Sequence, residues 1–229
     1  MKDIHGNDIR TGKNELDPMF WRHLKAYDLA SSCIKSAEVL DIGCGDGYGA
    51  YHMSRFVKRV VGIDYDEPAI VNAREKYNAP NLSYELLDAE KVISLDSKFD
   101  VITCFQNIEH IEHPENMVEG VKKILKPNGL FIVSVVNRLL RPGKSPYHYR
   151  EYSPVELESF MSNYFSKQLL FGIYGKGIMQ EFMMPREKDG LWFHVMLGWF
   201  RFLHPVSLNE FYFDNKPDKS LDILGIFME

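Results

Sequence analysis

Short apolar runs alternate along this chain with stretches whose apolar residues recur three and four positions apart. The runs predict β-strands at 38–42, 59–64, 82–86, 99–105 and 130–136. The stretches between them follow the spacing of one helix face, which predicts helices over 18–35, 50–56, 68–77 and from 114 onward. Strands that alternate with helices at short intervals are typical of a doubly wound parallel sheet. The pattern therefore predicts an α/β fold.

The regular alternation of strands and helices ends after Asn137. A loop rich in Pro, Tyr and His precedes a helix that begins at Ser153-Pro154, and an apolar strand follows at 167–173. Residues 175–220 have no regular period and are rich in aromatic residues, so we expect irregular structure there. The apolar run at 221–228 predicts one last strand.

The strongest local motif is the glycine-rich stretch after the first predicted strand. Glycine stands at positions 43, 45, 47 and 49, and the residues from Ala50 onward predict a helix. Glycine adopts positive φ without strain, and because it has no Cβ it lets backbone N–H groups approach a ligand. A loop between a strand and a helix N-terminus is where open parallel sheets hold nucleotide-like ligands. The stretch therefore predicts a ligand-binding turn.

The helix expected over 18–35 precedes this turn. Asp17 and Pro18 suit its N-cap and first helical position. The helix could cover the mouth of the glycine turn, or it could only pack against the core, and the sequence favours neither.

The spacing of the glycines argues against a dinucleotide ligand. A G-x-G-x-x-G fingerprint that starts at either of the first two glycines needs a third glycine at position 48 or 50, where this chain has Tyr48 and Ala50. No Gly-Lys-Ser/Thr phosphate loop is present either. Asp41 and Asp46 place carboxylates at the turn, which disfavours a pyrophosphate and suits a cationic amino group.

Acidic residues also end the next two predicted strands. Asp64 closes the second strand, where a carboxylate can accept hydrogen bonds from both hydroxyls of a ribose. Asp88, Ala89 and Glu90 follow the third strand, where an acid can accept from an adenine amino group. The ligand implied carries a ribose, an adenine-like base and a positive amine, and no phosphate.

On these residues the chain resembles the class I S-adenosylmethionine-dependent methyltransferases. Asp41-x-Gly43-x-Gly45-x-Gly47 is similar to their first motif, Asp64 to their ribose-binding acid, and Asp88-Ala89 to their adenine-contacting pair. Residues 99–111 and 125–131 are similar to their fourth-strand motif and to the turn and strand that follow. The resemblance implies a Rossmann-like, doubly wound seven-stranded sheet, mostly parallel, with 221–228 as an antiparallel last strand.

The resemblance also implies a division of the chain and a set of cofactor contacts. We expect one domain over 1–229, with an N-terminal arm and cap helix (1–36), a cofactor-binding core (37–174), an insertion or lid (175–220) and a final strand (221–229). The cofactor implied is S-adenosyl-L-methionine. The residues implied to bind it are Asp41, Gly43, Cys44, Gly45, Asp64, Tyr65, Asp88, Ala89 and Gln106.

Two loops hold candidates for a catalytic base, which methyl transfer needs only when the acceptor must lose a proton, as a hydroxyl must. The first loop holds Glu109 and His110, of which His110 is our first choice. The second loop holds His148. His110 and His113 are three positions apart, a spacing found in metal sites. Their place in a loop before the helix at 114 explains that spacing better, so we expect no metal.

Composition narrows the partners and the location. The net charge is −5 and no block of consecutive basic residues occurs, which disfavours nucleic acid as the substrate. The three cysteines form no disulfide or metal-like spacing and the first residues are polar, so we expect a cytoplasmic protein. The apolar run at 191–203 is shorter than the ~20 residues that cross a bilayer. That run could be a core-facing helix, a lid or a membrane-surface contact.

The methyl acceptor is less constrained. The Asn-Pro-Pro-Tyr motif of adenine N-methyltransferases and the Pro-Cys pair of cytosine enzymes are both absent. A looser similarity, carried by 17–30, 45–49 and 147–154, connects the chain with methyltransferases of glycan biosynthesis and implies O-methylation of a sugar hydroxyl. The alternatives are N- or C-methylation of a quinone, phenol or amine, a non-catalytic cofactor-binding protein, and an NAD(P)-dependent reductase.

Overall fold

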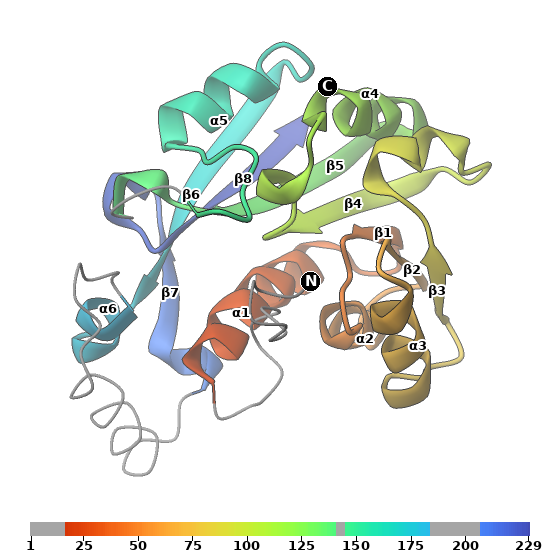
Figure 1. Cartoon of the computed structure of the whole chain (residues 1–229), viewed down its shortest axis with the longest axis horizontal. Helices are drawn as coiled ribbons and strands as arrows, with labels where there is room; N and C mark the ends of the chain where they lie inside the picture. The colour runs from red at the N-terminus through yellow and green to blue at the C-terminus, as the bar shows by residue number, and fades with distance from the viewer. Residues whose placement is uncertain (1–16, 141–144, 184–206) are drawn as a thin grey trace.

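The computed structural model describes residues 17–140, 145–183 and 207–229. The polar arm at 1–16 and the aromatic run at 191–203 lie outside the described residues. The described strands form one eight-stranded sheet in the order β3-β2-β1-β4-β5-β8-β6-β7 (Figure 1). This is the α/β architecture that the alternation of strands and helices predicts.

The strands lie close to the predicted positions. They are β1 (Glu38–Ile42), β2 (Arg59–Asp64), β3 (Leu82–Leu86), β4 (Phe99–Phe105), β5 (Leu125–Val136), β6 (Lys167–Gly175), β7 (Phe211–Asp214) and β8 (Asp222–Met228). The α-helices of the described chain are α1 (Pro18–Cys33), α2 (Tyr48–Ser54), α3 (Glu67–Lys76), α4 (Pro114–Ile124), α5 (Pro154–Met161) and α6 (Ile178–Met183). None of these helices has both the length and the apolar character needed to cross a membrane.

The strand directions confirm one part of the prediction and correct another. β1 to β5 run parallel, and β8 lies between β5 and β6, antiparallel to both. The antiparallel last strand is therefore confirmed. The expected number of seven strands was wrong, because β7 pairs antiparallel with β6 and adds an eighth strand at the edge. Its four residues are too few to show a period of two in a segment expected to be irregular.

β5 begins earlier than the apolar run indicates. Leu125 pairs with Phe99, and the register then shifts so that Leu130 pairs with Val101. Asn128 has a φ of 60°, in the left-handed region that Asn tolerates better than most residues. The turn expected between the helix at 114 and the strand at 130 therefore lies inside β5, at this shift of register.

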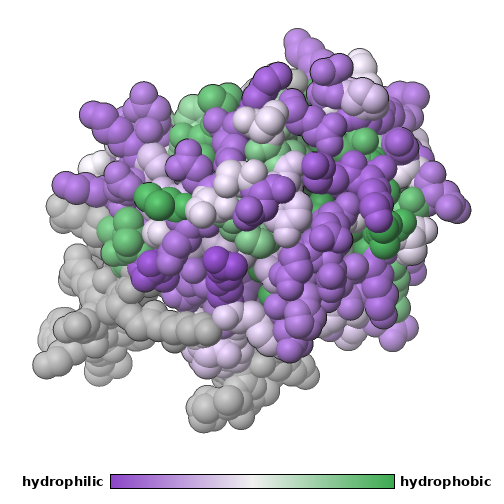
Figure 2. Space-filling model, turned by 90° about the horizontal axis from the view of Figure 1, so that it is seen from above, coloured by the Kyte–Doolittle hydropathy of each residue, from purple (hydrophilic) through white to green (hydrophobic). Residues whose placement is uncertain are grey.

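Helices cover both faces of the sheet (Figure 1). α1, α2 and α3 pack on one face, with Leu24 and Ile70 in that core cluster. α4, α5 and the short 3₁₀ helix η1 (Ala89–Ser94) pack on the other face, with Val121 and Leu157 in the second cluster. The surface seen from above is mainly hydrophilic, with scattered apolar side chains (Figure 2). This arrangement leaves the carboxyl ends of the parallel strands as the edge where ligands of such sheets bind.

Two helices begin where the sequence predicts, and a side chain caps each of them. Asp17 accepts the N–H of Met19 at 2.9 Å, and Pro18 occupies the first position of α1. Ser153 and Glu156 form a reciprocal capping box at the start of α5. The second cap fixes the end of the loop that approaches the candidate site.

Candidate functional site

The glycine-rich turn connects β1 to α2 and holds three glycines at positive φ. Gly43, Gly45 and Gly47 have φ values of 73°, 53° and 87°. A Cβ on Gly43 would lie 2.3 Å from Cγ of Asn107, whereas a Cβ on Gly45 would meet nothing within 4 Å. Glycine at position 43 is therefore required by the backbone conformation and by the side chain packed against it.

Asp64 holds this turn from the end of β2. Its Oδ2 accepts the N–H of Gly45 at 2.9 Å, and its Oδ1 accepts the N–H of Asp66, also at 2.9 Å. Two further N–H groups of the turn donate to the carbonyl oxygen of Ile63, at 2.8 and 3.0 Å. The carboxylate and the turn are thus fixed relative to each other before any ligand binds.

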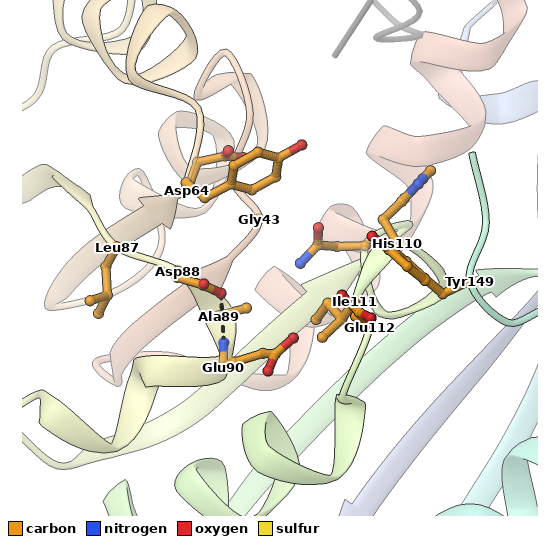
Figure 3. A pocket seen from close by; sticks show the side chains of 12 residues that line it. Gly43, Asp64, Leu87, Asp88, Ala89, Glu90, His110, Ile111, Glu112 and Tyr149 are labelled. Atoms are coloured by element: carbon orange, nitrogen blue, oxygen red, sulfur yellow. Dashed lines mark hydrogen bonds between the residues drawn. The ribbon is translucent and has the colours of Figure 1, made fainter. Parts of the chain in front are cut away.

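A pocket opens beside this turn, at the carboxyl ends of the parallel strands (Figure 3). The pocket is open to solvent, and its empty volume, open mouth included, is about 640 Å³. Several predicted site residues line it: Gly43, Asp64, Tyr65, Asp88, Ala89 and His110. The other lining residues are outside the predicted set, although Glu90 was noted in the acidic stretch after the third strand: Leu87, Glu90, Asn107, Ile111, Glu112 and Tyr149. Each of these lies within two positions of a predicted site residue, which is the signal that could have found them.

Asp88 also caps a helix at the pocket wall. Its Oδ1 accepts the N–H of Glu90 at 3.0 Å at the start of η1 (dashed line in Figure 3). The carboxylate of Glu90 accepts in turn from the N–H of His113 at 3.1 Å and from Nδ2 of Asn116 at 3.2 Å. These contacts connect the wall formed by η1 to the start of α4.

The charged lining of the pocket is acidic. Asp64, Asp88, Glu90 and Glu112 line it, and neither Lys nor Arg occurs among the described lining residues. A pyrophosphate would be repelled by this lining, whereas carboxylates at strand ends can accept from ribose hydroxyls and from an adenine amino group. The residues present therefore fit an adenosyl group without phosphate, as in S-adenosylmethionine.

Asp41 lies beneath the turn and does not line the pocket. Its fully buried carboxylate accepts hydrogen bonds from Oγ1 of Thr103 at 2.7 Å and from the hydroxyl of Tyr27 at 3.2 Å. Burial raises the pKa of Asp41 to about 7, although both hydrogen bonds lower it. Successive side chains on a strand point to opposite faces, and position 41 points toward α1. The contact implied for Asp41 therefore stays a prediction, and what the structure shows is that its carboxylate binds Thr103 and Tyr27.

Cys44, Gly45 and Gln106 are likewise absent from the pocket lining. The Cys44 side chain is buried, and burial raises the pKa of its thiol. Gln106 has a φ of 51°, and its N–H donates to the carbonyl oxygen of Ser134 at 2.8 Å. This change of backbone direction at the end of β4 brings the next residue, Asn107, against the glycine turn.

α1 packs behind the glycine turn. The ring of Tyr27 lies edge-on to Phe105, with centroids 4.7 Å apart, and a Cβ on Gly49 would lie 2.1 Å from that tyrosine ring. No residue of α1 lines the described pocket. Of the two roles that the sequence left open for this helix, the structure favours packing.

The three candidate catalytic residues come together from two loops. Nδ1 of His110 lies 2.9 Å from the carbonyl oxygen of Tyr147, and the N–H of Tyr149 donates to the carbonyl oxygen of Glu109 at 2.9 Å. The rings of His110 and His148 lie edge to face with centroids 4.7 Å apart. The predicted loop around 147–152 therefore packs directly on the loop that follows β4, at the edge of the pocket.

The histidine pair that is close in sequence does not form this group. His113 is exposed, and its Nδ1 lies 3.7 Å from a carboxylate oxygen of Glu115. The ring next to His110 is that of His148. No sequence spacing indicates this second pairing.

Comparison with known proteins identifies the family. A family model described as a methyltransferase domain matches residues 17–170, more than half of the chain. A probable S-adenosylmethionine-dependent methyltransferase of Mycolicibacterium smegmatis is 32% identical over 163 residues, 69% of this chain and 63% of that protein. A ubiquinone biosynthesis O-methyltransferase of Glaesserella parasuis is 35% identical over 108 residues, 44% of this chain and 46% of that protein. The matches span less than two thirds of the length of these relatives.

A solved structure has the same fold. The S-adenosylmethionine-dependent methyltransferase of Thermotoga maritima described as a possible histamine N-methyltransferase aligns with a TM-score of 0.62 at 20% identity, over 91% of each chain. At this identity the likeness supports the Rossmann-like fold and nothing finer. From the family match, together with a glycine turn and strand-end acids that fit an adenosyl group, we conclude that the chain belongs to the class I S-adenosylmethionine-dependent methyltransferases.

Proposed function

We propose that this chain methylates a hydroxyl oxygen of a small molecule or glycan, with a sugar hydroxyl as the first candidate. S-adenosylmethionine, when bound, supplies a methyl group on a sulfonium sulfur, and S-adenosylhomocysteine is what remains after transfer. The observation that carries the choice of oxygen is the group of Glu109, His110 and His148 at the edge of the pocket. A hydroxyl must lose its proton on methylation, so its methylation is the one helped most by nearby groups that can accept a proton.

The remaining residues of the pocket are assigned to the cofactor. Asp64 accepts hydrogen bonds from the ribose, and Asp88 with Ala89 borders the adenine. Tyr65 is 60% exposed at the pocket, where its ring can lie against the base. The positive φ of Gly43 lets the turn approach the methionine part closely. These residues position the methyl group and exclude water, which is the contribution that this chemistry requires of the protein.

We further propose that the chain forms one domain that works in the cytoplasm. Two of its cysteines, Cys44 and Cys104, are buried free thiols, as expected in a reducing compartment.

Calorimetric titration with S-adenosylhomocysteine, NADH and NADPH tests the cofactor assignment. We expect binding of S-adenosylhomocysteine alone, because the pocket lining is acidic. Tight binding of NADPH without binding of S-adenosylhomocysteine would overturn the proposal in favour of a reductase.

Mass spectrometry after incubation with sugar, phenol and amine acceptors tests the acceptor assignment. We expect methylation of hydroxyl oxygens, with a sugar before a phenol. A phenol is the second candidate because of the similarity to the ubiquinone biosynthesis O-methyltransferase. Transfer confined to amines would contradict the proposal, and cofactor binding without transfer to any class would favour a non-catalytic protein. His148→Asn should lose transfer, whereas the matched control His113→Asn, at an exposed histidine outside the group, should retain it.

A further inference from the structure

The group of Glu109, His110 and His148 at the edge of the pocket has the composition of a metal site. Within the part of the chain that the structure describes, Glu109, His110 and His148 each offer one ligand atom, and these atoms lie within 4.8 Å of one another. A carboxylate with two imidazoles is a ligand set that first-row transition metals take, with coordination positions left open. We infer that these residues bind one divalent transition-metal ion, of the class of Mn²⁺, Fe²⁺, Co²⁺ and Zn²⁺.

Both histidines are held through Nδ1, which leaves Nε2 for a ligand. Nδ1 of His110 lies 2.9 Å from the carbonyl oxygen of Tyr147, and Nδ1 of His148 lies 2.8 Å from Oε1 of Glu151. A carbonyl and a carboxylate only accept, so in the neutral ring each Nδ1 carries the proton and each Nε2 presents the lone pair. Metal-binding histidines are almost always held in this way by a carbonyl or a carboxylate. Tyr147 and Glu151 therefore act as positioning residues for the two ligands.

The site is built before a metal arrives. The N–H of Tyr149 donates to the carbonyl oxygen of Glu109 at 2.9 Å, which joins the two loops that supply the ligands. Glu109 is 2% exposed, and the side chains of His148 and Glu151 are 8% and 7% exposed. Because the two loops are already joined and Glu109 and His148 are already buried, binding an ion requires little further loss of conformational freedom.

The place of the group identifies what the ion would do. His110 lines the cofactor pocket, so the ion would lie on the acceptor side of that pocket. Three protein ligands leave positions open for the acceptor, and a divalent ion lowers the pKa of a hydroxyl that it binds. This step rests on the proposed O-methylation. It narrows the acceptor to a molecule with two adjacent hydroxyls, such as a sugar diol or a catechol, because both oxygens can bind one ion.

The first test is metal binding without turnover. The full chain, freed of metal with a chelator, is titrated with Mn²⁺ by calorimetry and with Co²⁺ by its visible absorption. We expect one ion per chain. Glu109→Gln, His110→Asn and His148→Asn should each weaken Mn²⁺ binding at least tenfold, and Glu151→Gln should weaken it by about 10- to 100-fold. His113→Asn is the matched control and should bind Mn²⁺ as the unchanged chain does.

S-adenosylhomocysteine binding, measured on the same samples, distinguishes failure of the metal proposal from failure of the proposed function. A chain that binds S-adenosylhomocysteine but neither ion overturns the metal site and leaves the proposed function intact. Mn²⁺ binding that is unaffected by the three ligand variants, or equally weakened by His113→Asn, also overturns it. A chain that binds Mn²⁺ but no S-adenosylhomocysteine contradicts the proposed function instead. Methyl transfer to a diol that persists after verified metal removal rejects the role of the ion in catalysis.

Discussion

The hydroxyl of Tyr27 donates a hydrogen bond to the buried carboxylate of Asp41, 3.2 Å away, and so connects α1 to the strand that leads into the glycine turn. Thr103 donates a second hydrogen bond to the same carboxylate, at 2.7 Å. The pKa of Asp41 is nevertheless raised to about 7, because the effect of burial exceeds that of both hydrogen bonds. This one side chain therefore couples the stability of the turn to pH.

Because of Asp41, we expect the free energy of unfolding to fall as the pH rises from about 4 to about 7. Its pKa is about 7 in the folded chain and near 3.8 when unfolded, so between these values the folded chain holds a proton that the unfolded chain has lost. Raising the pH then favours unfolding, by about 1.4 kcal/mol per pH unit within this window. Asp41→Asn cannot ionise and should flatten this dependence. Urea unfolding across the window measures it. Identical slopes for Asp41→Asn and the unchanged chain would contradict the assignment.

The glycine turn predicts that two similar substitutions differ in effect. Gly43→Ala and Gly45→Ala both place a Cβ at positive φ, which costs about 1–2 kcal/mol each. Only at Gly43 does the new atom also collide with Asn107, at 2.3 Å. We expect Gly43→Ala to weaken S-adenosylhomocysteine binding more than tenfold and Gly45→Ala to weaken it less, as measured by calorimetry.

Removing the colliding side chain tests the cause. The double variant Gly43→Ala with Asn107→Gly should recover part of the affinity, since only the backbone strain remains. Equal losses in the two single variants, or no recovery in the double variant, would show that the contact with Asn107 is unimportant.

Substitution of Asp64 should lower the affinity for the cofactor. Asp64→Ala leaves ribose hydroxyls without their acceptor, at a cost of about 1–3 kcal/mol, or roughly a 5- to 150-fold higher Kd. It also removes the acceptor of the Gly45 N–H, so the loss should lie toward the upper end. Calorimetry with S-adenosylhomocysteine measures this, with Asp66→Asn as the control because that side chain does not line the pocket. Unchanged affinity of Asp64→Ala would mean that the ribose is held elsewhere.

The buried ion pair between α1 and β8 predicts a large stability effect. Nε of Arg22 lies 3.0 Å from Oδ2 of Asp222, and the two side chains are 6% and 1% exposed. Asp222→Ala leaves a buried guanidinium without this carboxylate and should destabilise the fold by about 3–5 kcal/mol. Replacing both residues, as Arg22→Met with Asp222→Ala, should recover much of that loss in urea unfolding.

An exposed pair provides the comparison. Arg138 lies 2.9 Å from Glu156, with side chains 46% and 42% exposed, so Arg138→Ala should cost at most about 1 kcal/mol. If Asp222→Ala costs no more than Arg138→Ala, the buried pair contributes nothing beyond an exposed one.

The sequence by itself determined most of the sheet. The central strands β1, β2 and β4 are buried on both faces, so each appears as an apolar run with the bounds of the strand. The bounds of the edge strand β3 also match the prediction. β7 was missed because a four-residue edge strand is defined by its pairing with β6 and not by a pattern of its own. The early start of β5 was missed for the same reason, since the pairing of Leu125 with Phe99 depends on the neighbouring strand.

The ligand chemistry was also determined by the sequence, because each acid and each glycine of the cofactor site stands next to the strand that positions it. Which side chains face the pocket was decided only by the tertiary structure. Asp41 points toward α1 while Asp64 reaches the pocket, although both belong to strands of the same sheet. The meeting of His110 with the loop of Tyr147, 37 positions away, depends on hydrogen bonds between two loops. Such contacts form only when the folded sheet brings the loops to one edge, and no local pattern encodes them.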